Sequence, residues 1–181
     1  TVRQGGEIEL VFDRRLKDKL SVFLFIDNGG YSMWPYVAMT RALFHHARDS
    51  FRRLRTFFFH NCVYDTVWED PRRRDKPIPL QEILRADPET RVILLGDAAM
   101  APYELLHRRG AIDFTSIQER PGIECLQDLR DRFPKSAWLN PAPRDRWDWS
   151  MGTFTIDHVQ KVFPMEDLTL NGIERLVSHL S

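Results

Sequence analysis

The chain has 181 residues, of which 43% are hydrophobic, 12% aromatic and 29% charged. This length and composition fit one globular domain with a substantial core, and they exclude a disordered chain, a collagen and a long repeat array. Lys and Arg together number 26, as do Asp and Glu, so the formal net charge is zero. Without a net charge to attract them, nucleic acid and anionic membranes are not the expected partners.

Cysteine usage and hydropathy favour a cytoplasmic location. Cys62 and Cys125 lie in apolar stretches, where we expect core thiols of a reducing compartment rather than a disulfide framework. The longest apolar run, residues 20–26, is far shorter than the roughly 20 residues of a membrane helix, and no signal peptide precedes it. Because the chain begins with Thr1 rather than Met, we also expect a domain of a longer polypeptide.

Apolar runs alternate with amphipathic helices over residues 20–181, which we expect to form one domain behind an N-terminal extension of residues 1–19. The run at 21–26 is β-branched and aromatic, as is typical of a strand buried on both faces of a parallel sheet. In chain order, the sequence predicts this strand, a turn at Asn28-Gly29-Gly30, a helix at 34–53, and strands at 55–60 and 63–68. A polar loop at 70–79, a helix at 80–86, a strand at 91–96 and helices at 102–109 and 123–133 follow. The last predicted elements are strands at 136–139 and 158–163 and a helix at 170–180 with Thr169 as N-cap.

These elements predict an α/β fold, with a doubly wound, mostly parallel six-stranded sheet, helices on both faces and a Rossmann-like layout. The connection between 55–60 and 63–68 is too short for a parallel crossover, so these strands should form an antiparallel hairpin at one sheet edge. Ligands of such folds bind outside the carboxyl ends of the central strands, where the strand order reverses. The residues directly after 21–26 and 91–96 should therefore meet there.

Two aspartates follow these buried strands. Asp27 comes after the first and Asp97 after the second, Ser32 lies at the start of the next helix, and neither loop contains Lys or Arg. Two carboxylates and a hydroxyl are hard oxygen ligands, which suit Mg²⁺ or Mn²⁺ and not Zn²⁺ or Cu²⁺. The alternative is that the two aspartates only cap helices or accept hydrogen bonds in turns.

A family resemblance rests on these same residues. Residues 23–33 read Phe-Leu-Phe-Ile-Asp-Asn-Gly-Gly-Tyr-Ser-Met, which resembles the first strand and metal-ion-dependent adhesion site of a von Willebrand factor A (VWA) domain, with its usual Asp-x-Ser-x-Ser signature. Residues 92–97 resemble the fourth strand and second site aspartate of that family, and the likeness covers most of residues 20–181. Within the family the sequence is most similar to the bacterial CoxE-like branch, whose members are associated with MoxR-type AAA+ ATPases.

The resemblance implies a metal site that departs from the usual pattern. Asp27 and Asp97 match the family's site aspartates directly, whereas Ser32 matches only if the loop absorbs one extra residue. Gly29 stands where the family has its first Ser, and the loop before the third helix lacks the family's Thr, for which Thr66 is the nearest earlier candidate. The remaining ligand-loop candidates are Asn28 and Gly30. Each lost hydroxyl removes a direct ligand, so we expect a weak or vestigial Mg²⁺ or Mn²⁺ site.

The function that the resemblance implies is a non-catalytic interaction module. Its partner would be a protein that offers an acidic residue to the site, in a system that includes a MoxR-type ATPase. The enzymatic alternative is a metal-assisted hydrolase that uses Asp27 as nucleophile or base together with Asp97. A third alternative is a structural domain in which neither aspartate has a functional role. In every case, the repulsion between two neighbouring carboxylates should require a cation, an Arg or a proton.

Other candidates have weaker patterns. The six histidines show no spacing typical of a zinc site. The run Arg72-Arg73-Arg74, in a loop other than those of the aspartates, is either solvated or a grip for phosphate or an acidic partner. Trp138, Trp147 and Trp149 either form an exposed recognition surface or pack inside their long loop.

Overall fold

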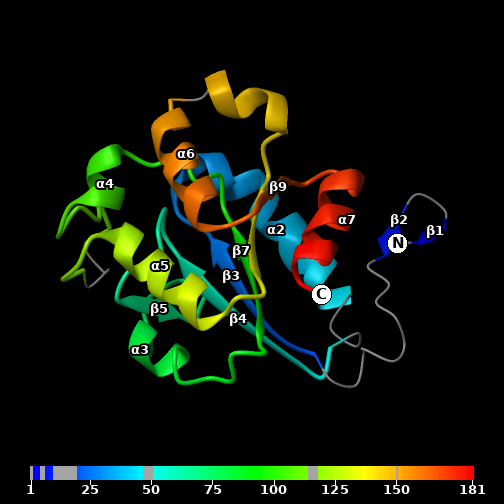
Figure 1. Cartoon of the computed structure of the whole chain (residues 1–181), viewed down its shortest axis with the longest axis horizontal. Helices are drawn as coiled ribbons and strands as arrows, with labels where there is room; N and C mark the ends of the chain where they lie inside the picture. The colour runs from blue at the N-terminus through cyan, green and yellow to red at the C-terminus, as the bar shows by residue number, and fades with distance from the viewer. Residues whose placement is uncertain (1, 5–6, 10–19, 47–50, 114–117, 150) are drawn as a thin grey trace.

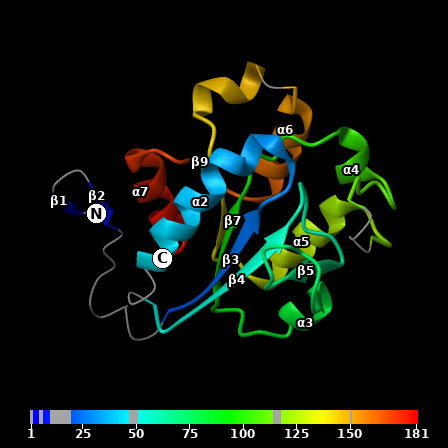
Figure 2. The same ribbon diagram turned by 180° about the vertical axis from the view of Figure 1, so that it is seen from behind.

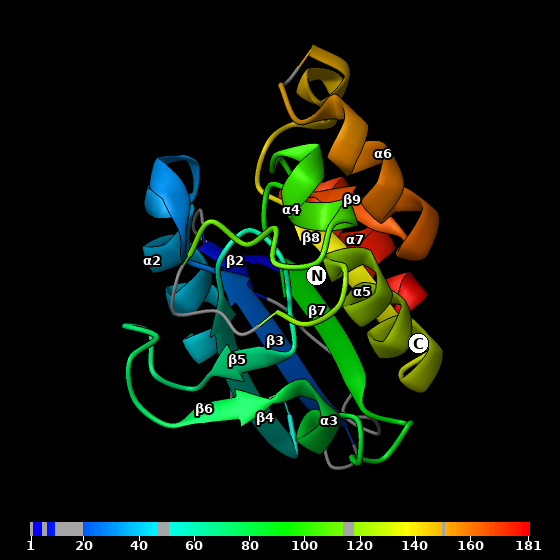
Figure 3. The ribbon, with the colours of Figure 1, turned by 90° about the vertical axis from the view of Figure 1, so that its left-hand side faces the viewer.

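The central sheet has seven strands in the order β6-β5-β4-β3-β7-β8-β9 (Figures 1 and 3). It is seen in a computed structural model that describes residues 2–4, 7–9, 20–46, 51–113, 118–149 and 151–181. From β4 to β9 neighbouring strands are parallel, whereas β5 pairs antiparallel with β4 and β6 antiparallel with β5. The strands are β3 (Ser21–Asp27), β4 (Arg53–Phe59), β5 (Thr66–Trp68), β6 (Pro77–Pro79), β7 (Arg91–Leu95), β8 (Ser136–Asn140) and β9 (Met165–Asp167).

Helices cover both faces of this sheet, so the predicted α/β fold with a mostly parallel sheet and an antiparallel edge is confirmed. Figure 2 shows α2 across the face that points away from the viewer in Figure 1, and Figure 3 shows α2 and α5 on opposite sides of the sheet. The helices are α2 (Gly30–His46), α3 (Leu80–Ile83), α4 (Pro102–Leu106), α5 (Gly122–Arg132), α6 (Thr153–Val162) and α7 (Leu170–His179), with a 3-10 helix η2 (Arg144–Trp149). None of the helices in the described ranges is long and apolar enough to cross a bilayer.

Successive side chains of β3 point to opposite faces of the sheet, where they contribute to two separate cores. Phe23 and Phe25 point into the core shared with α5 and α6, whereas Leu24 and Ile26 point into the core shared with α2 and α7. All four side chains are at most 5% exposed, as expected for a central strand covered on both faces. Cys62 and Cys125 are free and fully buried in the first core, which confirms their prediction as core thiols.

The strand predicted at 158–163 is wrong, because these residues belong largely to α6 and the strand β9 follows at Met165–Asp167. Ile156, Val159 and Phe163 are buried at a spacing of three and four residues, which is the period of a helix face. Their β-branched and aromatic character favoured a strand over the helical period.

Other differences concern counts and boundaries. The sheet has seven strands rather than six, because Pro77–Pro79 in the predicted polar loop forms the outermost strand. The edge hairpin is antiparallel as predicted, but residues 60–65 separate its strands, so the connection is longer than expected. α2 begins earlier than predicted, at Gly30, and is described as far as His46, whereas Arg53, where the helix was predicted to end, already belongs to β4. Within the predicted N-terminal extension, β1 (Val2–Gln4) and β2 (Glu7–Glu9) form a separate antiparallel pair.

Candidate functional site

The candidate site lies at the carboxyl edge of the sheet, by which we mean the edge where the parallel strands end. The chain leaves β3 in one direction toward β4 and crosses to the other side to form β7, so the strand order reverses at β3. Asp27 is the last residue of β3, and Asp97 follows β7, which pairs directly with β3. Ligands of doubly wound sheets bind at this reversal point.

Asp27 is the buried centre of the site, with only 1% of its surface exposed. Its Oδ1 atom accepts hydrogen bonds from the backbone N–H of Gly29 at 2.9 Å and of Asn61 at 3.2 Å. Its Oδ2 atom is buried and has no hydrogen-bond partner within the described part of the chain. The carboxyl lies against Gly96, where a Cβ atom would be 3.1 Å from Cβ of Asp27. One buried carboxylate oxygen is thus left to bind a proton or a cation.

The environment disfavours the charged form of Asp27. Burial raises the pKa of this carboxyl from its ordinary value of 3.8 to about 8, and the negative charge of Asp97 raises it as well. The N–H groups of Gly29 and Asn61 and the guanidinium of Arg73 act in the opposite direction and lower this pKa. Asp27 therefore carries a proton at neutral pH when no cation is bound, which relieves the expected repulsion between the two aspartates.

Asn61 and Glu104 connect three loops around Asp27. Asn61 has a left-handed φ of 59°, a conformation that Asn tolerates, and in it the backbone N–H points at Asp27. The Asn61 side chain donates to Oε1 of Glu104 at 2.8 Å, and Oε2 of Glu104 accepts from the N–H of Ala101 at 3.0 Å. Glu104 is only 3% exposed, so this network fixes the loop after β4 to the start of α4.

A second group of residues covers the Gly29-Gly30 turn. A Cβ atom on Gly29 would lie 1.8 Å from Cδ2 of His60, so the imidazole ring packs directly on the glycine backbone. His60 Nδ1 lies 3.4 Å from Oδ2 of Asp113, which also forms an ion pair with Arg73. The side chain of Asn28 donates to the carbonyl of Pro71 at 2.5 Å. The arginine-rich loop is a different loop from those of the two aspartates, as predicted, and it lies beside the site.

Asp97 borders an open pocket of about 390 Å³. Its Oδ1 accepts from the N–H of Ala99 at 3.0 Å, and its backbone carbonyl accepts from the side chain of Asn140 at 2.8 Å. The other residues that line this pocket are Ala99, Asn140, Ala142, Arg146, Trp147 and Ile156. Asp97 is thus partly accessible, whereas Asp27 is not.

The remaining predicted site residues have different positions. Ser32 is exposed in the first turn of α2, close to the Gly30 backbone, and Asn28 Oδ1 is a second buried oxygen without a partner in the described chain. Thr66 is buried in β5 opposite Pro79, and its described contacts include no hydrogen bond to either aspartate. The described residues contain no group of three His, Cys, Asp or Glu side chains that would hold a metal ion.

These donors nevertheless suit a hard cation in their chemistry. The unpartnered Oδ2 of Asp27 and the accessible carboxylate of Asp97 are oxygen ligands of the kind that Mg²⁺ prefers. With two carboxylates and one serine, about half of a six-oxygen shell would have to be water. The ligand set therefore fits Mg²⁺ or Mn²⁺ and predicts weak binding.

The structure adds to the site four residues that the sequence interpretation had not placed there, namely His60, Asn61, Arg73 and Glu104. Only His60 and Asn61 had a usable signal, because they follow a strand that runs parallel to β3 and must end at the same edge. Arg73 lies in a loop and Glu104 in the short helix α4. Their positions beside Asp27 depend on how these segments fold, which no local sequence pattern predicts.

Exposed hydrophobic side chains gather around the same edge. Most of the large hydrophobic side chains that are exposed in the described chain lie where segments leave the carboxyl ends of strands. They are Tyr31 and Trp34 in α2, Tyr103 in α4, Met151 and Phe154 at the start of α6, and Leu170 at the start of α7. Ile112 follows α4 and is adjacent to Asp113, which contacts His60 and Arg73, and Met39 lies farther along α2. Exposed apolar groups concentrated at one edge are typical of an interaction surface.

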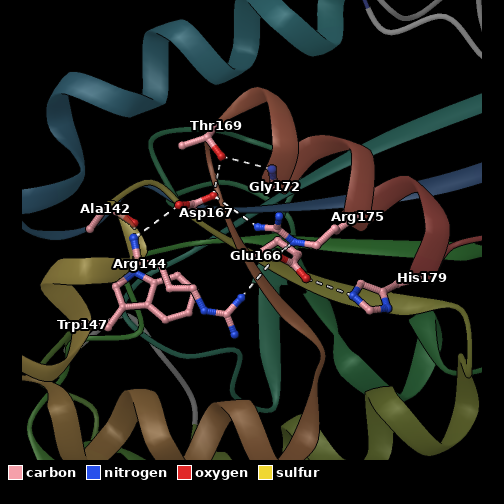
Figure 4. A network of polar contacts seen from close by, with 9 residues as sticks. All are labelled: Ala142, Arg144, Trp147, Glu166, Asp167, Thr169, Gly172, Arg175 and His179. Atoms are coloured by element: carbon pink, nitrogen blue, oxygen red, sulfur yellow. Dashed lines mark hydrogen bonds and ion pairs between the residues drawn. The ribbon is translucent and has the colours of Figure 1, made fainter.

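A second polar cluster, at β9 and α7, has its charges paired (Figure 4). Glu166 is 7% exposed in its side chain and contacts Arg175 at 2.6 Å, His179 at 3.1 Å and Arg144 at 3.7 Å. Asp167 accepts hydrogen bonds from the Thr169 hydroxyl and from the N–H of Arg144. Because both carboxylates have partners, this cluster stabilises the sheet edge and is not a candidate site.

Trp138 in β8 and Trp147 in η2 confirm the packing alternative, because both are buried. Trp138 is fully buried and donates to the carbonyl of Gly96, and Trp147 is 3% exposed and donates to the carbonyl of Ala142. The side chain of Trp149 lies outside the described part of the structure.

No family model matches the chain, and neither a curated protein nor a solved structure is significantly similar to it.

Proposed function

We propose that the chain is a non-catalytic VWA-like interaction module with a degenerate metal-ion-dependent adhesion site. The observation that carries this proposal is the buried Asp27, whose Oδ2 has no partner in the described chain, next to the accessible Asp97 at the reversal point of the sheet. The exposed hydrophobic side chains around that edge support a macromolecular partner rather than a small substrate. The antiparallel edge beside β4, which the connection length predicted, is consistent with the same family.

The residues that would hold Mg²⁺ or Mn²⁺ are Asp27, Asp97 and Ser32. The metal would supply a Lewis acid that a partner's carboxylate can bind. Gly29 contributes no hydroxyl, and Thr66 lies in the edge strand β5, so the affinity for metal should be low. By the resemblance to the bacterial CoxE-like branch, the partner system includes a MoxR-type AAA+ ATPase, and the two buried thiols favour the cytoplasm as the compartment.

Metal titration tests the site directly. Calorimetry on chelator-treated protein should detect weak Mg²⁺ and Mn²⁺ binding that tightens by up to tenfold per pH unit below about pH 8, because the cation must displace the Asp27 proton. Asp27→Asn should abolish this binding. Asp131→Asn, at an exposed aspartate of α5, is the matched control and should leave it unchanged. No heat from the unmodified protein at millimolar metal would mean that the site is vestigial.

A co-purification experiment tests the partner. Asp97→Ala should lower recovery of a MoxR-type ATPase from the same organism several-fold, because the partner's acidic residue would lose the metal that it binds. Asp131→Ala should recover as much ATPase as the unmodified chain. Equal recovery with all three proteins would mean that Asp97 has no role in the interaction.

The alternative of a metal-assisted hydrolase has one observation in its favour. A carboxyl with a pKa of about 8 can exchange a proton near neutral pH, as a general acid or base must. This alternative predicts turnover of generic phosphate or ester substrates that Asp27→Asn abolishes and Asp131→Asn preserves. Absence of turnover over a broad panel, at high protein concentration and with Mg²⁺ present, would contradict it.

A further inference from the structure

Helix α2 has an apolar face toward solvent as well as one toward the core. Its inner face carries Met33 and Thr40, which are buried, and Tyr36 and Val37, which are partly buried. Met33 belongs to the core shared with α7, and Tyr36 and Val37 pack against that core. Its outer face is exposed and repeats at the same helical spacing of three and four residues. We call this outer face the α2 stripe, and it consists of Tyr31, Trp34, Pro35, Ala38 and Met39.

The stripe is unusual for a surface helix. Tyr31 is 82% exposed, Trp34 65% and Met39 49%, and the rings of Tyr31 and Trp34 lie 4.8 Å apart. Residues 30–40 contain no Asp, Glu, Lys or Arg. Surface helices normally carry charged and polar residues on the solvent side, and a helix that is apolar all round is normally buried. A partner surface that covers the stripe is the physical explanation.

We propose that this partner is a second copy of the chain, bound through the α2 stripes about a two-fold axis. A two-fold interface places the same surface on both sides, so a charged face would repel itself whereas an uncharged apolar face is complementary to itself. The net charge of zero removes long-range repulsion between copies as well. The stripe therefore meets both electrostatic conditions for self-association.

The area is sufficient for a specific but weak dimer. Two aromatic side chains exposed to this extent offer roughly 350 Å², and the whole stripe offers on the order of 600 Å². Two copies would then bury on the order of 1,200 Å², which is the lower end of the range for specific interfaces. We expect a dissociation constant on the order of 10 μM for such a contact.

The sheet edges are poor alternatives for self-association. The outer strand β6 begins and ends with a proline, which has no N–H to donate to another strand. The other outer strand, β9, carries Glu166 and Asp167 with their paired arginines. Charge and proline are the usual means of blocking pairing at an edge.

Sedimentation velocity of the 181-residue chain, over concentrations from about 1 to 200 μM, tests the proposal around the expected dissociation constant. The unmodified chain should shift from monomer to dimer. Trp34→Glu and Trp34→Lys should each raise the dissociation constant by at least about 30-fold, because each places two like charges in a desolvated contact. An equimolar mixture of the two variants should recover the dimer, since opposite charges then face each other. Leu170→Glu, at an exposed leucine of α7, is the matched control and should dimerise normally.

Circular dichroism establishes that each variant is folded, and Tyr31→Glu replaces Trp34→Glu if that variant is not. A monomer at all concentrations, or a dimer that tolerates Glu at both positions 31 and 34, would overturn the proposal. Binding of the monomeric chain to phosphatidylcholine vesicles, lost in Trp34→Glu, would overturn it in favour of a lipid surface. These outcomes are independent of metal binding, so the dimer and the proposed function can fail separately.

Discussion

At the scale of single residues, the carboxyl group of Asp27 lies in a buried environment that disfavours its ionisation. Its pKa is about 8 in the folded chain and 3.8 in its ordinary environment, so between these values the folded state holds a proton that the unfolded state has lost. Stability falls with rising pH wherever the folded state binds more protons. The contribution of Asp27 is therefore most favourable below pH 4 and is lost as the pH rises toward 8.

Asp27→Asn should consequently stabilise the metal-free protein at high pH. Asn keeps an oxygen to accept from Gly29 and Asn61 but cannot ionise, so we expect a free energy of unfolding higher by on the order of a few kcal/mol at pH 8 and by less at pH 5. Urea denaturation in the presence of a chelator measures both values, with Asp131→Asn as the control. A difference of the same size at both pH values would contradict the assignment of the raised pKa to Asp27.

Gly29 is a residue-scale test of the packing over the site. An added methyl group would overlap the His60 ring, so Gly29→Ala should destabilise the fold by about 1–3 kcal/mol. The double variant Gly29→Ala with His60→Ala removes the obstructing ring. Its loss of stability, measured by urea denaturation, should be smaller than the sum of the two single losses. Additive losses would mean that the ring does not obstruct this position.

At the scale of elements, the start of α7 was correctly predicted. The Thr169 hydroxyl accepts from the N–H of Gly172 at 3.1 Å, as an N-cap should, and donates to Asp167 at 2.6 Å. Thr169→Ala should lower the free energy of unfolding by about 1 kcal/mol. Thr169→Ser keeps a capping hydroxyl and should retain most of this contribution to stability. Thermal denaturation distinguishes the two, and equal effects of Ala and Ser would exclude a capping role.

Helix α7 could be predicted from the sequence, whereas much of α6 was predicted as a strand, and the difference has a physical reason. Thr169 combines an N-cap with a clear apolar period, so local and tertiary preferences agree. In residues 158–163 the side chains of Val159 and Phe163 favour a strand locally, and only their packing against the sheet selects the helix. The short edge strand β6 is likewise stabilised by pairing with β5 and not by its own two prolines.

At the scale of the whole molecule, Pro77 and Pro79 limit growth of the sheet. Replacing both with Val would restore N–H donors to an exposed edge with high β-propensity, so the double variant should aggregate more readily. Light scattering during gentle heating measures this. Pro88→Val, at an exposed turn proline, is the control and should not change it. Equal aggregation of both variants would mean that loss of any proline, and not the edge, is responsible.

The whole-molecule view also separates what could be predicted of the site from what could not. Asp27 and Asp97 follow buried apolar runs, and the rule that ligands bind at the reversal point brings them together from sequence alone. Arg73, Glu104 and Asp113 reach the site only because three loops fold over it, and loop paths depend on contacts distant in sequence. The equal numbers of acidic and basic residues indicated no partner, yet on the fold residues 30–40 of α2 form a stretch without Asp, Glu, Lys or Arg.

Pro35 interrupts the backbone hydrogen bonding of the α2 stripe. Proline has no N–H, so residue 35 cannot donate the usual helical hydrogen bond to the carbonyl of Tyr31. One backbone acceptor on an otherwise apolar face is therefore not satisfied in the ordinary way, and it lies at one end of the stripe. A surface that covers the stripe therefore has to place a hydrogen-bond donor opposite this carbonyl or leave the carbonyl in contact with water.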